Sequence, residues 1–552
     1  MTNNPGSFEQ SHDTQPSLTG GAVLIRSLHT EGVRVIFGLP GVQLYHAMMP
    51  LLDYPDIQFI TTRHEQATTY MADGYARASG GIGVSMIVPG PGLQNASAGI
   101  TNAYAASSRV LVICGQIERD KIGKDVGVLH EINDQLDVIK PITKWQSRIL
   151  AAKDVATTVQ EAFHQLRTGR PRPVEIEIPP EALSENTLAL PYSPPATSPP
   201  LVDGEAIEEA AALINEARNP IIWAGGGIHN SGASEILLRF AEYLQIPILT
   251  TPEGKGAISD RHYLSLGTPP GRSTGESKDP LRDFFYTCDL VLALGTRFAT
   301  ANPTADQKGL QVDIDSGELG RNHDNTFGIE GDVREVLTNL LEAIQTVSAP
   351  RDSKKSQLEA LRNSRYNDPQ NQVEPQHAYI QALRSNIPDD AILVTDMTIM
   401  AYYSRVHFAT YQPRSYFTSS YSGNLGSAFP TALGVKVAQP TKVVVSLSGD
   451  GGFLFNSQEL ATAAQFGINV IAVVFNDGAY GNVKRDMKTL FDGKSVGVEL
   501  SNPDFMKLAD AYGVAGVQAR SPEEFADALR KATTLNVPVL LEVLVTEMPS
   551  PF

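Results

Sequence analysis

Glycine and acidic residues follow two successive apolar runs in the last third of the chain. The segment GDG at 449–451 comes after one run, and the pair ND at 476–477 ends the next. Because open parallel sheets bind ligands at the carboxyl ends of their strands, we expect both segments at one sheet edge. The carboxylates of Asp450 and Asp477 are hard oxygen ligands that suit Mg²⁺. Backbone N–H groups of a glycine turn suit phosphate oxygens, and the candidates are Gly449, Gly451 and Gly452.

A glutamate in the first third of the chain is a second candidate for chemistry. Glu65 follows the apolar run at 57–62 and opens a stretch with helical character. The glycine-rich segments FGLPG at 37–41 and VPGPGLQNASAGI at 88–100 flank it in sequence. A glutamate at the start of a helix is stabilised by the helix dipole, which is a sufficient structural explanation when it stands alone. The flanking segments favour a functional role instead.

The order of these segments resembles that of thiamine-diphosphate-dependent enzymes. In that family the metal is held by the aspartate of GDG, by the second residue of a later NN pair, and by a backbone carbonyl two residues further on. The resemblance implies thiamine diphosphate and Mg²⁺ as cofactors, with Asp450, Asp477 and Ala479 as metal ligands. Asp477 departs from the pattern, because its carboxylate keeps the oxygen ligand but adds a charge. Glu65 matches the glutamate that hydrogen-bonds the aminopyrimidine N1′ and so promotes proton loss from thiazolium C2.

The same resemblance implies further cofactor contacts. The segment YSGNLG at 421–426 is similar to the one that supports the bent cofactor. Leu425 would be the wedge beneath the two rings, and the Gly423 carbonyl would accept from N4′. An ordinary core position for Leu425 is the alternative. The remaining candidates, from the end of an apolar run and from the motifs FG-x-PG and GPG-x-x-N, are Thr398, Pro40 and Asn95.

Within this family the chain resembles the acetolactate synthases. CGQ at 114–116, followed by TK at 143–144, is similar to their TGQ…TK stretch, and Gln116 matches a glutamine near the substrate. This implies decarboxylation of pyruvate or a similar 2-oxoacid, with transfer of the acyl anion to an acceptor. Asp486 stands where a tryptophan favours 2-oxobutyrate as acceptor. The segment that contacts flavin in the synthases reads GTPPGRSTG at 267–275 here, so FAD binding stays open.

Two valines bear on the choice of reaction. Simple pyruvate decarboxylases carry an aspartate after FG-x-PG and a glutamate shortly after the metal loop, where this chain has Val42 and Val483. Acids at those places help to protonate the reaction intermediate and release an aldehyde, so apolar residues favour carboligation. The alternative is a non-carboligating 2-oxoacid decarboxylase, or a C–C lyase or hydrolase acting on a diketone or a sulfonated aldehyde.

His130 is the most informative remaining polar residue. Together with Leu129 it replaces the Phe-Gln pair that lies near the second substrate in the synthases. An imidazole titrates near neutral pH, so His130 could transfer a proton, with Glu131 orienting its ring. A purely structural pairing of these two side chains is the alternative. Gln43 and Arg485 are further candidate substrate contacts, although Arg485 could equally form a surface ion pair.

Alternating apolar runs and helical stretches place these residues on three α/β units. Continuous apolar strands separated by helices are typical of parallel sheets covered on both faces. We therefore predict three doubly wound parallel-sheet domains: pyrimidine-binding at 18–186, central at 203–348, and diphosphate- and Mg-binding at 377–552. Around them we predict a disordered tail and two linkers, at 1–17, 187–202 and 349–376. The family resemblance implies that Glu65 and Asp450 meet between subunits of a homodimer or homotetramer.

Composition narrows the partners and the compartment. The formal charge of −17 argues against a nucleic acid partner, which would require clustered Lys and Arg. No apolar run is long enough to cross a bilayer, so we expect no membrane partner. The first residues lack the features of a signal peptide, and Cys114 and Cys288 each stand alone in an apolar run. We therefore expect a cytoplasmic enzyme that acts on a small 2-oxoacid.

Overall fold

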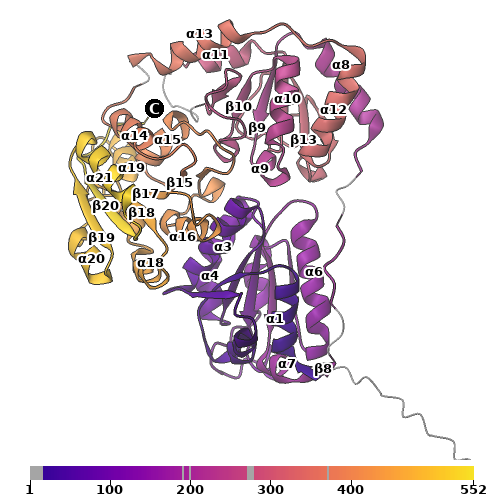
Figure 1. Cartoon of the computed structure of the whole chain (residues 1–552), viewed down its shortest axis with the longest axis vertical. Coiled ribbons are helices and arrows are strands. Elements are labelled where there is room, and N and C mark those ends of the chain that lie inside the picture. The colour runs from indigo at the N-terminus through magenta and orange to yellow at the C-terminus, as the bar shows by residue number, and fades with distance from the viewer. Residues whose placement is uncertain (1–16, 189–191, 198–200, 270–278, 370–371, 552) are drawn as a thin grey trace, which may run out of the picture.

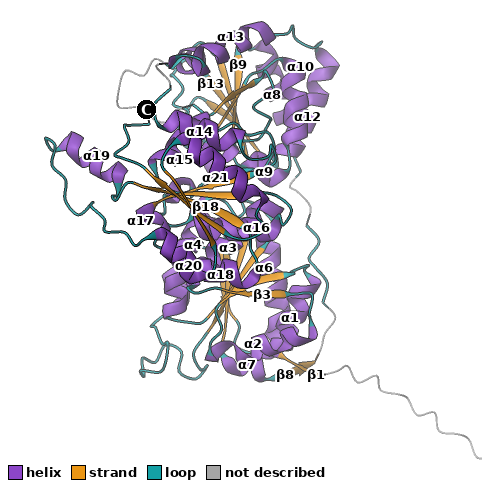
Figure 2. Ribbon diagram, turned by 60° about the vertical axis from the view of Figure 1, so that its left-hand side comes forward, coloured by secondary structure: helices purple, strands orange, loops and turns teal. Residues whose placement is uncertain are grey.

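Three six-stranded parallel sheets follow one another along the chain in the computed structural model (Figure 1). The structure describes residues 17–188, 192–197, 201–269, 279–369 and 372–551. Helices lie on both faces of each sheet, as the view in Figure 2 shows for strands seen nearly edge-on. The predicted fold class, three doubly wound α/β units, is therefore confirmed. Among the described helices, none combines the length and the apolar character needed to span a bilayer.

The N-terminal unit has the strand order β3-β2-β4-β5-β7-β6. Its strands are β2 (Val35–Gly38), β3 (Gln58–Thr61), β4 (Gly83–Ile87), β5 (Val110–Gly115), β6 (Trp145–Arg148) and β7 (Val174–Ile178). Its helices are α1 (Gly20–Thr30), α2 (Tyr45–Met48), α3 (Glu65–Ser79), α4 (Pro91–Ala105), α5 (Gln135–Ile139), α6 (Val155–Arg167) and α7 (Pro180–Ser184). An antiparallel pair, β1 (Ser17–Thr19) with β8 (Asn186–Leu188), takes the last residue of the predicted tail and the first two of the predicted linker into strands. The rest of that tail lies outside the described residues.

The central unit has the order β11-β10-β9-β12-β13-β14. Its strands are β9 (Pro220–Ala224), β10 (Ile248–Thr250), β11 (Ser265–Gly267), β12 (Leu290–Leu294), β13 (Lys308–Asp313) and β14 (Thr326–Glu330). Its helices are α8 (Gly204–Glu216), α9 (Gly227–Ser231), α10 (Ser234–Leu244), α11 (Pro280–Tyr286) and α12 (Val333–Val347). The second predicted linker contains α13 (Lys355–Tyr366), which buries Leu358 in the core of this unit.

The C-terminal unit has the order β16-β15-β17-β18-β20-β19. Its strands are β15 (Ile392–Thr395), β16 (Tyr416–Phe417), β17 (Val444–Gly449), β18 (Val470–Asn476), β19 (Ala515–Ala519) and β20 (Val539–Leu544). Its helices are α14 (Gln376–Ser385), α15 (Ile399–His407), α16 (Ala428–Ala438), α17 (Asp450–Phe453), α18 (Leu460–Phe466), α19 (Gly481–Leu490), α20 (Phe505–Tyr512) and α21 (Pro522–Thr534). The GDG turn goes directly into the single turn α17, which begins at Asp450 itself.

In each sheet there is a pair of neighbouring strands whose following strands lie on opposite sides of the pair, and doubly wound folds form ligand crevices at such places. These places lie between β2 and β4, between β9 and β12, and between β15 and β17. FGLPG begins with the last two residues of β2 and continues into the loop after it, and the GPG segment follows β4. In the other two units, GGG at 225–227 follows β9, and GDG ends β17 and begins α17. The glycine-rich segments thus lie at the three crevices.

Helix α3 of the N-terminal unit packs directly against α16 of the C-terminal unit (Figures 1 and 2). The two backbones touch because each helix contributes a glycine. A Cβ atom at Gly74 would overlap the carbonyl oxygen of Thr431, and one at Gly434 would overlap that of Met71. Residues of both units share one hydrophobic cluster around this crossing. The two halves of the chain are therefore fixed to each other at backbone-contact distance.

Candidate active site

A small cavity of about 80 Å³ lies at the crevice of the C-terminal unit. We call it the metal-loop cavity, because its lining includes the predicted metal loop at 449–452. It brings together eight of the predicted cofactor residues: Thr398, Leu425, Gly449, Asp450, Gly451, Gly452, Asp477 and Ala479. Leu425 comes from the segment after β16, and the other seven come from the ends of β15, β17 and β18 or from the segments that follow them; these four strands are neighbours in the sheet. The sheet topology therefore does what the sequence pattern predicted and places GDG beside ND.

Two buried or half-buried carboxylates face this cavity. Burial raises the pKa of Asp450, against hydrogen bonds donated by Asn502 and the Gly478 N–H. Burial and the neighbouring charge of Asp450 raise the pKa of Asp477 to about 6. Two mutually repelling carboxylates in a buried site favour a bound cation, which would relieve the repulsion.

Glycines keep the floor of the cavity open. A Cβ at Gly451 would lie 2.6 Å from the Tyr480 ring, and one at Gly452 would lie 3.0 Å from an Asp396 oxygen. A Cβ at Gly481 would overlap the Asp477 carboxylate. A side chain at any of these three glycines would clash with its neighbours. Because glycine has no side chain, none covers the backbone N–H groups near GDG, which can then contact a diphosphate.

Leu425 lies in a loop that Asp396 fixes in place. The Asp396 carboxylate, 1% exposed, accepts hydrogen bonds from the Gly426 N–H (3.1 and 2.9 Å) and from the Met397 N–H (2.9 Å). Leu425 is partly exposed and lines the cavity, which supports the wedge role over an ordinary core position. Gly423, in the left-handed conformation with φ 66°, ends the turn before it. Asp396 is not among the residues predicted for the site, although its position directly after the apolar run at 391–395 indicates the end of a strand.

Glu65 is 8% exposed and is the first residue of α3. The Asn95 side-chain amide of α4 donates to its carboxylate over 3.1 Å, so the structure brings these two predicted residues together. Gly92 lies beside the same carboxylate, since a Cβ there would be 3.5 Å from Glu65 Oε1. Pro40 is exposed on the loop after β2. Gln116 is buried, and its side-chain oxygen accepts from the Ile117 N–H instead of pointing a free acceptor outward.

His130 lies close to the GPG turn, but its predicted partner is different. Its backbone has φ 69°, and its carbonyl oxygen is so near Gly90 that a Cβ there would overlap it. The imidazole Nδ1 is buried without a hydrogen-bond partner. The Glu131 carboxylate accepts from the N–H groups of Val126, Gly127 and Val128, so the prediction that Glu131 orients the ring is wrong in this structure. Arg485 donates to Asn482 and Asp486 on its own helix.

The two predicted halves of the cofactor site are not joined in one copy of the chain. All described residues that line the metal-loop cavity lie between 396 and 548, and Glu65 is not among them. The cavity is also far below the roughly 300 Å³ at which small-molecule sites begin. Within one copy of the chain, the residues predicted to bind the diphosphate and the residue predicted to contact the pyrimidine therefore do not line one cavity.

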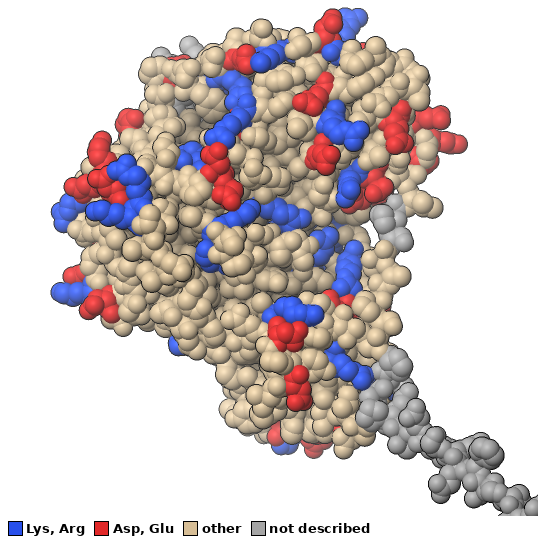
Figure 3. Space-filling model, in the orientation of Figure 1, with Lys and Arg blue, Asp and Glu red and all other residues tan. Residues whose placement is uncertain are grey.

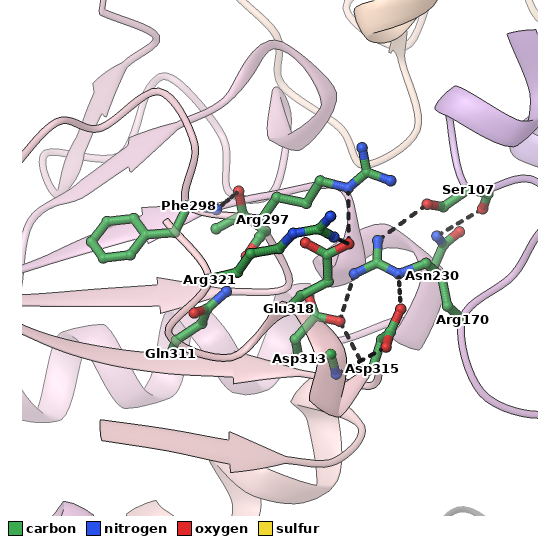
Figure 4. A network of polar contacts seen from close by, with 12 residues as sticks. Ser107, Arg170, Asn230, Arg297, Phe298, Gln311, Asp313, Asp315, Glu318 and Arg321 are labelled. Atoms are coloured by element: carbon green, nitrogen blue, oxygen red, sulfur yellow. Dashed lines mark hydrogen bonds and ion pairs between the residues drawn. The ribbon is translucent and has the colours of Figure 1, made fainter. Parts of the chain in front are cut away.

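A larger cavity of about 830 Å³ lies where the three units meet. In Figure 3, Lys and Arg side chains gather along the boundary between the upper and lower parts of the molecule. Figure 4 shows Arg170 reaching from the N-terminal unit to Asp313 and Asp315 at the end of β13, over 2.9 and 3.0 Å. The cavity lining includes five arginines: Arg109, Arg167, Arg170, Arg297 and Arg405. Their positive charge suits an anionic ligand.

Comparisons with known proteins agree with this arrangement. Three domain descriptions of the thiamine pyrophosphate enzymes match in order: the N-terminal TPP binding domain at 18–138, the central domain at 207–340 and the C-terminal TPP binding domain at 396–543. A probable acetolactate synthase large subunit from Methanocaldococcus jannaschii is 36% identical, over 96% of this chain and 92% of its own length. The acetolactate synthase large subunits of Lactococcus lactis and Haemophilus influenzae are 33% and 31% identical, each over 96% of this chain and over 93% and 95% of theirs. With its crevices, its glycine-rich loops and its three matched domains in the same order, the chain belongs to the thiamine pyrophosphate enzyme family.

Proposed function

We propose that the protein is an acetolactate synthase-like carboligase. It would decarboxylate pyruvate or a similar 2-oxoacid and transfer the acyl group to an acceptor. The similarity to acetolactate synthase large subunits over 96% of the chain carries this proposal. Val483 lines the metal-loop cavity and is 46% exposed, so an apolar side chain stands where simple decarboxylases have an acid. This supports carboligation over aldehyde release.

Mg²⁺ and the diphosphate would be held by the C-terminal unit. The proposed metal ligands are the carboxylates of Asp450 and Asp477 and the Ala479 carbonyl, a hard oxygen set that suits Mg²⁺. The raised pKa values of the Asp450 and Asp477 carboxyl groups support a bound cation, which would relieve the repulsion between the two carboxylates. Backbone N–H groups from Gly449 to Gly452 and the Thr398 hydroxyl would contact phosphate oxygens.

The chain's own groups have distinct tasks. When bound, thiamine diphosphate would supply a nucleophilic carbon and an electron sink for the decarboxylation of a 2-oxoacid. Glu65, held by Asn95, would hold a proton at the pyrimidine N1′. Leu425 would support the two rings from below, and the Gly423 carbonyl would accept from N4′. His130 and Gln116 are proposed to lie near the substrate, where the imidazole of His130 would transfer a proton.

Two subunits are needed to complete a site under this proposal. The metal-loop cavity has no described lining residue from the N-terminal unit. We infer a homodimer, or a homotetramer built from dimers, in which Glu65 of one subunit faces Asp450 of another. The cytoplasmic location expected from the sequence stays a prediction.

Co-expression of two inactive variants tests the shared site. Glu65→Gln and Asp450→Ala chains should each be inactive alone. A hybrid dimer carries both changes at one site and neither at the other, so random assembly should restore about one quarter of the wild-type activity. Activity is measured on the isolated mixed population. Absence of any restoration, with hybrids demonstrated by differential tags, would contradict a site shared between subunits.

Product analysis tests the reaction itself. The purified protein is incubated with thiamine diphosphate, Mg²⁺ and pyruvate, and the products are followed by NMR. Acetolactate is the expected product. Acetaldehyde alone would replace the carboligase by a simple decarboxylase, and no turnover with the cofactor bound would mean that the donor is another 2-oxo compound.

Val483→Glu should shift the products toward aldehyde. A carboxyl group at the cavity edge could protonate the intermediate, and a positioned acid contributes about 100-fold or more to proton transfer. We expect the aldehyde share to rise by about 10- to 100-fold. Val483→Gln is the matched control, since it has the same shape without the acidic proton. Equal product ratios in the two variants would remove proton donation as the cause.

We also infer that the interdomain cavity binds a dinucleotide, with FAD as the candidate. Its volume of about 830 Å³ is within the usual range for small-molecule ligands, and the arginines of its lining, among them Arg109 and Arg405, suit phosphate oxygens. Asp313 and Asp332 line the cavity and can accept from ribose hydroxyls. Most of the altered segment at 267–275 lies outside the described residues, so it gives no argument here.

Flavin release tests this cavity. Acid-denatured wild-type protein should release about one flavin per chain, detected by its fluorescence. Thr300→Trp, at an exposed position of the cavity lining, should lower the flavin content without changing thiamine diphosphate binding. Release of a non-flavin nucleotide would keep the cavity and replace FAD, and absence of any nucleotide after reconstitution would contradict both.

A further inference from the structure

A buried glutamate of the C-terminal unit faces the segment between β3 and α3 of the N-terminal unit, which leads into Glu65 in the same chain. Glu459 is fully buried, at 0% exposure, and ends the turn Ser457–Glu459 that lies between α17 and α18. Its backbone N–H donates to the Asn456 carbonyl over 3.0 Å. Asn456 in turn donates from its side chain to the Gly426 carbonyl, next to Leu425, over 2.7 Å. The glutamate is thus tied to the loop that carries the proposed wedge.

The carboxylate of Glu459 binds backbone rather than a charged side chain. Both of its oxygens lie 3.1 Å from the Arg63 N–H, and the Thr462 hydroxyl donates to it over 2.6 Å. Burial raises the pKa of Glu459 to about 7, and hydrogen bonds from Thr462 and from the backbone of Arg63 and His64 oppose that rise. The Arg63 guanidinium makes a separate contact, a 2.7 Å hydrogen bond to Gln465. These contacts hold the segment between β3 and α3 at its backbone.

That segment determines where Glu65 stands. His64 is the N-cap of α3, and its ring accepts from the Gln66 N–H over 3.2 Å, so Glu65 is the first helical residue. Its carboxylate is held at one end by Asn95. The position of its backbone follows from the two preceding residues, whose N–H groups point at Glu459. In its ionised form, a buried carboxylate that accepts from backbone N–H groups fixes a loop more firmly than a neutral acceptor does.

We propose that Glu459 is a positioning residue for Glu65. It would hold the Arg63–His64 backbone so that the Glu65 carboxylate meets the pyrimidine ring at the required distance. This proposal rests on the proposed role of Glu65 in a thiamine-diphosphate enzyme. It goes beyond that role by assigning the loop's anchor to the diphosphate-binding unit of the same chain.

Glu459→Gln tests the anchor in the full-length protein without cofactor. Amide hydrogen exchange of the 60–67 segment, followed by mass spectrometry, should be about 10- to 100-fold faster, since a charge-assisted acceptor is replaced by an amide. Peptides from the other sheets should be unchanged. Gln465→Ala is the matched control, because it removes only the side-chain contact of Arg63 and should leave the exchange of this segment within about twofold.

The loaded protein gives the second measurement. Glu459→Gln should slow C2–H/D exchange of bound thiamine diphosphate by about 10-fold or more, with Mg²⁺-dependent cofactor affinity unchanged. Glu459→Asp should rescue part of the loss, since it keeps the charge but is shorter. If Glu459→Gln does not fold, Thr462→Val should show a smaller change in the same direction, because it removes one donor to the carboxylate.

The outcomes separate this proposal from the function on which it rests. Slow C2–H/D exchange in the wild type would contradict the proposed cofactor chemistry, while the exchange of the 60–67 segment would still judge the anchor. Fast wild-type exchange that is equal in Glu459→Gln would overturn the positioning role. So would a uniform rise in amide exchange over the whole chain with weaker cofactor binding, because Glu459 would then be a general stabilising residue.

Discussion

Glu65→Gln should abolish catalysis while leaving thiamine diphosphate bound. The amide keeps the size of the side chain and can still receive the Asn95 hydrogen bond, but it cannot hold the proton at the pyrimidine N1′. General acid–base groups contribute about 10²- to 10⁴-fold, so we expect C2–H/D exchange of the bound cofactor to slow by that factor. Exchange is measured by rapid acid quench and NMR. It requires no substrate, so it is independent of which 2-oxoacid the enzyme uses.

Asn95→Ala is the informative companion to this variant. It keeps the carboxylate but removes its 3.1 Å partner, so exchange should slow by only about 10-fold. Cofactor affinity should stay within a few-fold of wild type in both variants, because the diphosphate half is untouched. Normal exchange in Glu65→Gln would remove this residue from its proposed role, whatever the product analysis shows.

Asp450→Ala should eliminate Mg²⁺-dependent cofactor binding. The variant loses one metal ligand, and even residues that only orient metal ligands cost about 10- to 100-fold in affinity when changed. We therefore expect thiamine diphosphate to bind at least about 100-fold more weakly. Binding is measured by titration of the apoprotein at fixed Mg²⁺, with a parallel titration of Mg²⁺ at fixed cofactor.

Asp450→Asn separates the ligand from its charge. It keeps an oxygen for the metal, so its loss of affinity should be smaller than that of Asp450→Ala. Both changes disturb the hydrogen bonds from Asn502 and Gly478, and Asn502→Ala controls for that disturbance. Unchanged cofactor affinity in Asp450→Ala would sink the metal assignment.

The interior of the fold could be predicted from the sequence because its strands are continuous apolar runs. Interior strands such as β5, β12 and β18 are continuous apolar runs of the kind that predicts a buried strand. The edge strands β6, β11, β14, β16 and β19 have a weaker pattern, since an edge strand is short or only half buried. The interior strand β7 is difficult to predict for another reason. It carries the buried Glu175 and Glu177, and alternating charged residues are typical of a strand with one face in solvent.

In the site, too, some contacts could be predicted from the sequence and others could not. The GDG and ND segments could be placed together because each ends a strand and the two strands are neighbours. Asn502 donates to Asp450 from a loop without a recognisable pattern, so nothing in the sequence indicates this contact. The bond between Glu459 and the Arg63 backbone joins residues almost four hundred positions apart, and only the packing of two units reveals it. The catalytic roles assigned to individual residues stay predictions.

The glycine crossing of α3 and α16 sets a rule for recombining this protein with its relatives. Gly74 and Gly434 each leave room for the backbone of the other helix, so a side chain introduced on one helix cannot be accommodated by the other. A chimaera that takes its first unit from one parent and its last from another should therefore inherit both helices from the same parent. The boundary between exchangeable modules then runs through the interior of the C-terminal unit, after α16, and not through either linker.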